Sequence, residues 1–318
     1  MIGCLGTTGL PSCLLTAAGA PQNGRMNQIV ELGEFLRSCR GRMTPADAGM
    51  PVGARRRVPG LRREELAQLS GVSIDYSTRL EQGRSRTASP EVLESLATAL
   101  RLDDAEYAHL FDLAHQRPVR PRDGGRVPRQ AVSEAVRRLL ATLDAAYCPA
   151  FILGRRTDVV AANPLAGALI ADFDARPAHE RNQARFLFLD PAARELYADW
   201  DAAAADTAAM LRMDAGRYPD DRELARLLAE LTARSPLFRK YWAQQRVHER
   251  TDGAKGYRHP VVGDLTVHYQ ALAVAGETDQ TLFIYTTEPG SASDTALRLL
   301  AAWSSASPSR VDAKAALD

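Results

Sequence analysis

The chain has 318 residues, of which 45% are hydrophobic, and its 40 Lys or Arg and 39 Asp or Glu give a formal net charge of +1. This length allows two domains, each with a hydrophobic core of its own. No apolar run approaches the roughly 18 residues of a membrane span, and Cys4, Cys13, Cys39 and Cys148 show neither CxxC pairs nor other metal-ligand spacing. We therefore expect a cytoplasmic protein without a membrane-spanning segment, a zinc site or disulfide bonds.

The first 25 residues are rich in Gly, Ala and Thr and are only mildly apolar. They lack the basic start of a secretion signal, which makes a weak signal peptide the less favoured interpretation. A helical pattern begins only after Met26. We expect residues 1–25 to be a disordered extension, or to precede the true translation start at Met26.

A helix is predicted from about Gln28 to Met43, because Ile29, Leu32, Phe35 and Leu36 repeat on one face. The segment that follows, 44–60, contains glycines, prolines and the basic triplet Arg55 to Arg57. This composition is typical of an exposed loop.

Two short helices around a tight turn are predicted between Leu61 and Gly83 (LRREELAQLSGVSIDYSTRLEQG). Gly71 stands where the chain must reverse with a positive φ, and Ser73 is placed to cap the second helix. The apolar residues of the first helix are Leu66, Ala67 and Leu69. Helical spacing puts Tyr76, Ser77 and Leu80 on the inner side of the second helix and leaves Ile74, Asp75, Thr78 and Arg79 facing outward. Such a unit can place one helix in the major groove of DNA, although many all-α domains contain similar helix pairs.

The motifs ELAQLSGVS and RLEQGR resemble the xenobiotic-response-element (XRE) class of bacterial helix-turn-helix regulators. The resemblance implies binding to a double-stranded DNA operator, and we expect a homodimer on a palindromic site because one recognition helix covers only a few base pairs. It implies DNA contacts by Arg62, Arg63, Ser73, Ile74, Asp75, Thr78, Arg79 and Arg84. Glu81 matches a class glutamate that pairs with an arginine of the first helix, here Arg37 or Arg40. One departure from the class is Ser77, where relatives usually carry a larger side chain.

Basic charge is concentrated around this unit, since residues 37–86 contain 11 Arg against five Asp or Glu. Neutralising DNA phosphates requires such clustering. Arg79 is suited to a bidentate contact with guanine, and Arg84 to a phosphate contact. The triplet Arg55 to Arg57 has two interpretations: solvated loop surface, or a segment that follows a phosphate backbone or enters a minor groove.

Two further helices complete the first domain. Ser89 and Pro90 form a strong helix start before a face of Val92, Leu93, Leu96 and Leu100. Asp103 and Glu106 form a second, capping-type start. We expect a lambda-repressor-like α-helical domain at residues 26–115, followed by a linker at 116–130 that is rich in proline, glycine and arginine.

The pattern then becomes mixed. After a helix at 131–145, the β-rich runs CPAFILG and DVVAAN flank a polar turn and predict a hairpin, and Asn163 and Pro164 begin the next helix. Helical runs follow at 224–231 and after Ser235 and Pro236. The long strands GDLTVHYQALAVAG and TLFIYTTEP close an α+β domain, and the first of them has Leu265, Val267 and Tyr269 on one side.

Five stretches of this region resemble, in order, the ligand-binding domain of regulators related to the methylenomycin-cluster regulator MmyB. They are PAFILGRRTDVVAAN, FLFLDPAARELYADW, LLAELTARSPLFRKYWAQQRV, YRHPVVGDLTVHYQAL and DQTLFIYTTEPG. The resemblance implies a PAS-like ligand-binding domain, which we place at 131–304 before a disordered tail at 305–318. It also implies a one-component transcription factor that binds a small apolar molecule, fatty-acid-like in at least some relatives.

The ligand contacts are expected among polar residues that orient the molecule and aromatic residues that form walls. The candidates are Asn163, Trp200, Phe238, Trp242, His248, Tyr269 and Tyr285, with His259 and Phe283 as further members. For each aromatic the alternative is an ordinary core position, and for Asn163 it is a helix cap. For the domain as a whole, the alternative is a dimerisation or protein-interaction platform without a ligand.

No catalytic residue, metal site or cofactor is predicted. The spacing of His248, Glu249, His259 and His268 does not match HxH or HExxH, which also disfavours a cupin barrel as the second domain. A GxSxG motif, a P-loop and a dinucleotide-binding glycine motif are all missing from the sequence.

Overall fold

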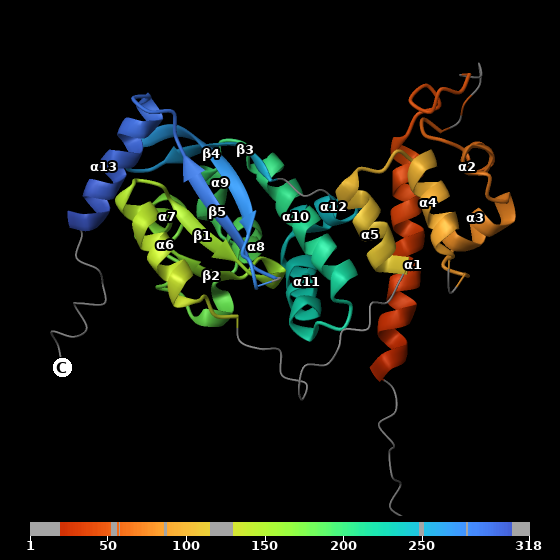
Figure 1. Ribbon diagram of the computed structural model, residues 1–318, viewed down its shortest axis with the longest axis horizontal. Coiled ribbons are helices and arrows are strands. Elements are labelled where there is room, and N and C mark those ends of the chain that lie inside the picture. Colours follow the sequence, from red (N-terminus) through yellow and green to blue (C-terminus); the bar gives the residue numbers. More distant parts are fainter. Residues whose placement is uncertain are drawn as a thin grey trace, which may run out of the picture.

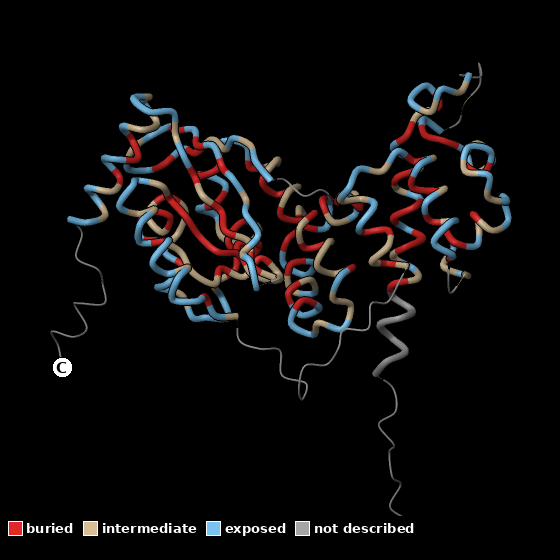
Figure 2. Tube along the Cα trace, in the orientation of Figure 1, coloured by how far each residue is buried: buried red, intermediate tan, exposed pale blue. Residues whose placement is uncertain are grey.

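The computed structural model describes residues 20–51, 56, 58–85, 88–114, 130–247, 251–277 and 279–306, without the side chains of residues 20–27. Within these ranges the chain forms two lobes (Figure 1), one helical and one built around a sheet. Buried residues gather in each lobe separately (Figure 2), around a long central helix in the first and against the sheet in the second. The expected α-helical domain followed by an α+β domain is confirmed.

The first lobe contains α1 (Ala20–Arg42), α2 (Arg63–Ser70), α3 (Ile74–Glu81), α4 (Pro90–Ala99) and α5 (Asp104–Ala114). Phe35, Leu66, Leu80, Leu93 and Leu110 are fully buried in its core. The first helix starts earlier than the expected Gln28, so part of the predicted extension is helical. Of the apolar residues of α2, Leu66 and Ala67 are buried, whereas Leu69 is 37% exposed.

Local capping explains where these helices begin. The Ser73 hydroxyl accepts a hydrogen bond from the Tyr76 N–H, and Ser89 does the same for Val92. Asp103 and Glu106 exchange side-chain and backbone hydrogen bonds, the capping box that the sequence predicts. Gly71 ends α2 with φ 67°, a conformation that favours glycine.

The second lobe has one antiparallel sheet in the order β2-β1-β5-β4-β3. Its strands are β1 (Ala150–Leu153), β2 (Val159–Ala162), β3 (Asp252–His259), β4 (Gly263–Ala273) and β5 (Thr281–Thr286). The predicted hairpin forms β1 and β2, and the predicted closing pair forms β4 and β5. Leu265, Val267 and Tyr269 are buried on one face of β4, as their alternation predicts.

Helices pack on both faces of this sheet, although one face of β4 stays exposed at Thr266, His268, Gln270 and Leu272. On one side α6 (Glu134–Ala145) packs on β1 through Leu140. The other side is covered by α7 (Pro164–Leu169), α8 (Gln183–Leu189), α9 (Pro191–Leu196), α10 (Trp200–Arg217) and α13 (Ala292–Ala306). Beside α10 lie α11 (Arg222–Arg234) and α12 (Pro236–Trp242), and short 3-10 turns occur at Arg155–Thr157 and Ala178–Glu180.

No element is predicted from the sequence at β3, α8, α9, the long helix α10 or α13, and α13 runs to Ala306 where a tail was expected from residue 305. The helices α10 and α12 lie between the sheet and the first lobe (Figure 1). The expected linker lies outside the described residues apart from Gln130, as does most of the expected tail. None of the helices within the described ranges combines the length and the apolar character that crossing a membrane requires.

Candidate DNA-binding face and ligand pocket

The outward side of α3 carries the residues that the helix-turn-helix pattern assigns to DNA. Ile74 is 46% exposed, Asp75 and Arg79 are also exposed, and Thr78 is half-buried. The Arg79 guanidinium lies 5.9 Å from the centre of the Tyr76 ring. Ser77 and Leu80 are buried on the inner side, so the predicted division of this helix into two faces is confirmed.

A buried carboxylate fixes α3 to the rest of the lobe. The Glu81 side chain, 1% exposed, accepts hydrogen bonds from Arg40 Nε (2.6 Å) and Arg63 Nε (2.9 Å). Arg37 donates to the backbone carbonyl of Glu81 (2.7 Å). Burial alone would raise the pKa of Glu81, but the hydrogen bonds from Arg40 and Arg63 hold it below its ordinary value. Of the two arginines expected to pair with this carboxylate, Arg40 is the one that does.

Two of the residues that were assigned to DNA, Arg63 and Ser73, also make contacts within the lobe. Arg63 is held by Glu81, although its side chain remains 41% exposed. Arg62 precedes α2, and its backbone N–H donates to Glu65 (2.7 Å). Ser73 serves as a helix cap, while Arg84 is exposed just after α3. Base or phosphate contacts by these residues stay predictions.

The basic triplet is described only at Arg56, because Arg55 and Arg57 lie outside the described residues. Arg56 donates two hydrogen bonds to Glu65 (2.6 and 2.8 Å) and one to the carbonyl of Gly60 (2.8 Å). The bonds from Arg56 to Glu65, helped by the one from the Arg62 N–H, lower the pKa of Glu65 to about 2. The Arg56 guanidinium therefore braces the loop against α2, which favours a structural role for this member of the triplet.

A cavity of about 280 Å³ lies between α10 and the sheet of the second lobe. Its apolar walls come from the strands and from α10, and they comprise Leu153, Met210, Met213, Tyr269, Ala271, Ala273 and Phe283. Its polar side chains include Arg155, Arg217, Lys255, Asp206, Asp214 and Asp279. The cavity is thus apolar along its walls and carries both signs of charge.

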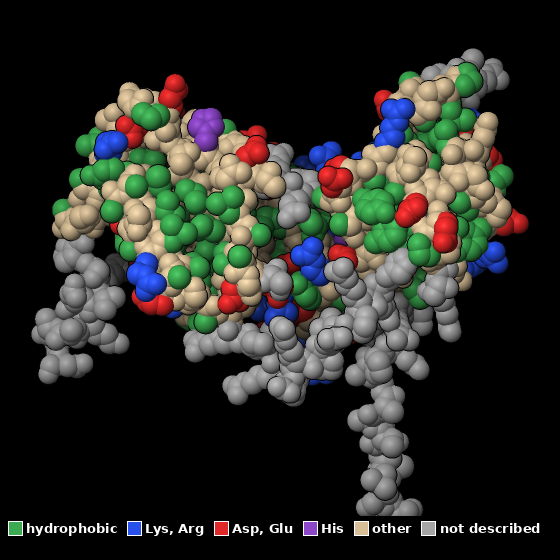
Figure 3. Space-filling view, viewed as in Figure 1, with side chains coloured by type: hydrophobic (Ala, Val, Ile, Leu, Met, Phe, Trp, Pro, Cys, Tyr) green, Lys and Arg blue, Asp and Glu red, His purple; other side chains and the backbone are tan. Residues whose placement is uncertain are grey.

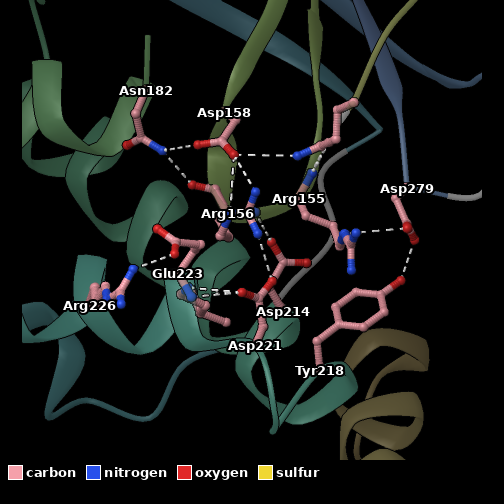
Figure 4. A network of polar contacts seen from close by, with 12 residues as sticks. Arg155, Arg156, Asp158, Asn182, Asp214, Tyr218, Asp221, Glu223, Arg226 and Asp279 are labelled. Carbon is pink, nitrogen blue, oxygen red and sulfur yellow. Dashed lines mark hydrogen bonds and ion pairs between the residues drawn. The ribbon is translucent and has the colours of Figure 1, made fainter. Parts of the chain in front are cut away.

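Three of the polar lining side chains contact one another (Figure 4). Arg155 Nε lies 3.4 Å from Asp279, and its guanidinium stacks 5.0 Å from the centre of the Tyr218 ring. The Tyr218 hydroxyl donates to the same Asp279 carboxylate. Burial, together with this anionic partner, raises the pKa of Tyr218 to about 12, so the hydroxyl is a donor at neutral pH.

The turn at Arg155–Thr157 is strained and is held from α10. Arg156 and Thr157 have φ values of 62° and 59°, in the left-handed region that β-branched residues such as threonine rarely adopt. The Arg156 N–H donates to Asp214 (2.6 Å), and the Arg156 guanidinium bridges Asp158 (2.9 Å) and Asp221 (2.8 Å). Burial raises the pKa of Asp214 to about 6 despite the bond from Arg156.

Of the sequence-predicted ligand residues, Tyr269 lines this cavity, as does the further candidate Phe283. The other candidates within the described residues have core or capping positions. Asn163 accepts from the Ala166 N–H as a helix cap, and the Trp200 indole donates to the Leu187 carbonyl. Phe238 stacks on Trp242, and the Tyr257 hydroxyl donates to that of Tyr285. His259 contacts the carbonyl of Ala168 and the N–H of Val261, while His248 lies outside the described residues.

The charged cavity residues were missed because they come from segments far apart in the sequence. Arg155 lies in a hairpin turn, Asp214 and Arg217 on an alanine-rich helix, and Asp279 in a strand connection. Only the Asp214-Arg217 pair, one helical turn apart and next to Met213, offered a local signal.

Comparison with protein families assigns both lobes. Residues 31–110 match a family described as a helix-turn-helix domain, and residues 132–300 match the MmyB-like transcription regulator ligand binding domain. No curated protein matches the chain. The two matches cover the two lobes in turn, and both expected resemblances are confirmed.

Proposed function

Because this chain belongs to the family of MmyB-like transcription regulators, we propose that it binds a specific DNA operator and that a small amphiphile in the cavity beside α10 controls it. The single observation that carries the ligand half is the cavity itself, which combines apolar walls with charged side chains. The matched families describe regulators rather than enzymes, and we assign the chain no catalytic step.

For the DNA half, we propose that α3 enters the major groove. The exposed Ile74, Asp75 and Arg79 then face base edges. A helix of eight residues covers few base pairs, so we propose a homodimer on a palindromic operator.

This half is tested by selecting bound sequences from a random duplex pool with the full chain. We expect a two-fold symmetric site whose halves are about one helical turn, roughly 34–36 Å, or a multiple of it apart. Enrichment of single, asymmetric sites would contradict the dimer, and a lack of enrichment would contradict specific binding.

For the ligand half, we propose a fatty-acid-like molecule whose chain lies against Met210, Ala271 and Phe283. Arg217 is open to a carboxylate head group, because its side chain is 47% exposed and its ion pair with Asp112 is long at 3.8 Å. Dodecanoate, dodecanol and dodecylamine share one chain and differ in the head group. Native mass spectrometry and thermal unfolding should show binding and stabilisation by dodecanoate above the other two. Equal or no stabilisation by all three would contradict the proposed ligand.

A second candidate function, a dimerisation or protein-interaction platform, is favoured by apolar surface on the second lobe. Figure 3 shows hydrophobic side chains gathered over its sheet. Leu272 is 45% exposed, Leu299 60% and Trp303 50%, the last two one turn apart on α13. If this surface joins two copies, Leu299→Glu should convert a dimer to a monomer in light scattering without changing amphiphile binding. A dimer that persists would count against the platform on α13.

A further inference from the structure

Helix α10 takes part in two structures at once, the wall of the cavity and the contact with the DNA-binding lobe. Met213 lines the cavity and also packs against the hydrophobic core of the first lobe. Arg217 lines the cavity, and its Nε lies 3.8 Å from Asp112 of α5. The same two side chains therefore contact both the ligand space and the DNA-binding domain.

The packing between α10 and α5 is close. A Cβ added at Gly216 would lie 2.7 Å from both Nδ1 and Cε1 of His109, nearer than side-chain atoms normally approach. His109 is 3% exposed, and burial lowers its pKa to about 3, so it is neutral under ordinary conditions. Glycine at this position thus lets α10 lie directly on a buried side chain of the first lobe.

Further contacts fasten α1 to the chain just after α12. Gln245 donates to Glu34 (3.1 Å), and Ser38 donates to the carbonyl of Gln244 (3.1 Å). Val247, 3% exposed, is buried in the core of the first lobe. Arg212 of α10 is also buried and donates to the Trp242 carbonyl (2.6 Å). Burial lowers the pKa of Arg212 to about 10, and the nearby carboxylates of Glu31 and Glu34 on α1 offset part of this shift. The lobes are joined by a packed interface as well as by the connecting chain.

We propose that α10 transmits occupancy of the cavity to the DNA-binding lobe. A molecule that fills the space beside Met213 and Arg217 displaces these side chains, and the contact of α10 with α5 and α1 loosens. The operator-binding lobe then changes its position or order relative to the second lobe, which is the change that DNA affinity reports. This inference rests on the proposed function, because it assumes that the cavity is the sensory site.

The coupling is tested without a ligand by filling the cavity from the strand side. Ala271 lines the cavity, and Ala271→Phe in the full chain places a ring in that space. The matched control is Gln270→Phe, which adds a ring at the preceding residue of β4, where the side chain is exposed. We expect faster hydrogen exchange in residues 104–114 and an operator affinity changed by about fivefold or more in Ala271→Phe, with neither change in the control.

A second variant acts at the interface and leaves the cavity wall in place. Gly216→Ala puts a methyl group against His109, whereas Gly167→Ala on α7, where the added Cβ meets nothing within 4 Å, is the control. Alanine favours helix in both variants. Faster exchange in residues 104–114 for Gly216→Ala alone supports the proposal.

The outcomes separate the inference from the function on which it rests. If dodecanoate binds but leaves exchange in residues 104–114 unchanged, and Ala271→Phe and Gly216→Ala leave operator affinity unchanged, the coupling through α10 is overturned and the ligand site survives. If none of the three amphiphiles binds while both variants alter operator affinity, the proposed ligand fails and the coupling stands. If Gly216→Ala still binds dodecanoate but its operator affinity no longer responds to it, the coupling runs through the contact of α10 with α5.

Discussion

Two carboxylates, the buried Glu81 in the first lobe and the half-buried Asp214 in the second, show how differently the two lobes are built. Glu81 accepts hydrogen bonds from two arginines, and they hold its pKa below the ordinary value. Asp214 accepts one backbone N–H, from Arg156, and its pKa is raised to about 6. The first carboxylate is compensated within the fold, whereas the second lies at a cavity wall with capacity left for another partner. The carboxylate of the DNA-binding lobe thus has charged partners on its neighbouring helices, whereas the carboxylate of the ligand-binding lobe has one backbone partner.

The same contrast holds for the backbone. The turn of the helix-turn-helix uses glycine, Gly71, for its positive φ, while the turn at the cavity uses Arg156 and Thr157. Non-glycine residues in that region cost on the order of 1–3 kcal/mol each and persist only where neighbours hold them. Here the neighbours are Asp214 and Asp221, on and just after α10, so the strained turn and the transmitting helix share hydrogen bonds.

The largest expected effect is at Glu81. Glu81→Gln removes the charge between Arg40 and Arg63, and the free energy of opening the first lobe should fall by about 3 kcal/mol because a buried ion pair loses one partner. The measurement is native-state hydrogen exchange of α3 in the full chain.

The control for this prediction is Glu94→Gln, an exposed carboxylate on α4. It should change the exchange of α3 by a few tenths of a kcal/mol at most. Equal effects in the two variants would show that Glu81 stabilises the lobe no more than a surface charge does. The contrast between Glu81 and Asp214 would then be wrong.

The second largest effect is expected on DNA binding, through the exposed side of α3. Arg79→Ala should weaken binding to the preferred operator by about 2 kcal/mol and relax one base preference, as expected for loss of a guanidinium contact to guanine. Arg84→Ala, just beyond α3, should weaken binding to all sequences alike. Titrations of both variants against matched and scrambled duplexes at one salt concentration measure the difference. If the base preference of Arg79→Ala were unchanged, Arg79 would not contact a base.

Helix starts and buried strands were the features of this chain most predictable from sequence. Ser89 with Pro90, and Asp103 with Glu106, are local signals, and the structure places caps at both. Alternation along β4 predicted Leu265, Val267 and Tyr269 on the buried face. These features depend on neighbours in the sequence, which periodicity and capping chemistry record.

The transmitting helix and the cavity were not predictable in the same way. The sequence of α10, WDAAAADTAAMLRMDAGR, lacks a single apolar face because this helix contacts the sheet on one side and α5 on another. The strand β3 (DGAKGYRH) has few apolar residues and forms through its backbone pairing with β4. Arg155, Asp214 and Asp279 meet only in the folded chain, so no spacing marks them as one site.

The third prediction concerns the carboxylate of Asp214, which lines the cavity. The folded pKa of Asp214, about 6, lies above its ordinary value of 3.8, so the folded state keeps a proton that the unfolded state releases between these values. Stability should therefore fall as pH rises through this window and stay lower above it. Asp214→Asn removes this loss of stability, because the amide does not titrate, and its oxygen can still accept the hydrogen bond from the Arg156 N–H. Because Asp214 is only half-buried, we expect the variant to be more stable by about 1–2 kcal/mol at neutral pH, with little gain near pH 4.

Thermal and denaturant unfolding across this pH range measure the effect, with exposed Asp220→Asn as the control. A constant difference between Asp214→Asn and the parent protein at every pH would mean that Asp214 has an ordinary pKa. In that case burial would not disfavour the charged form of Asp214, and the contrast with Glu81 would be smaller.

The smallest effect compares two helix caps of nearly equal geometry, one in each lobe. The Ser73 hydroxyl accepts from the Tyr76 N–H at 3.2 Å, and the Ser133 hydroxyl accepts from the Val136 N–H at 3.3 Å. Each serine-to-alanine variant should destabilise its own helix by about 1 kcal/mol. Only Ser73→Ala should also weaken operator binding, because it frees the end of α3 that carries Ile74 and Asp75, whereas α6 packs on the sheet far from that surface. If Ser133→Ala weakened operator binding equally, the DNA-binding lobe would be sensitive to general loosening of its neighbour, and α10 would lose its status as the specific connection between them.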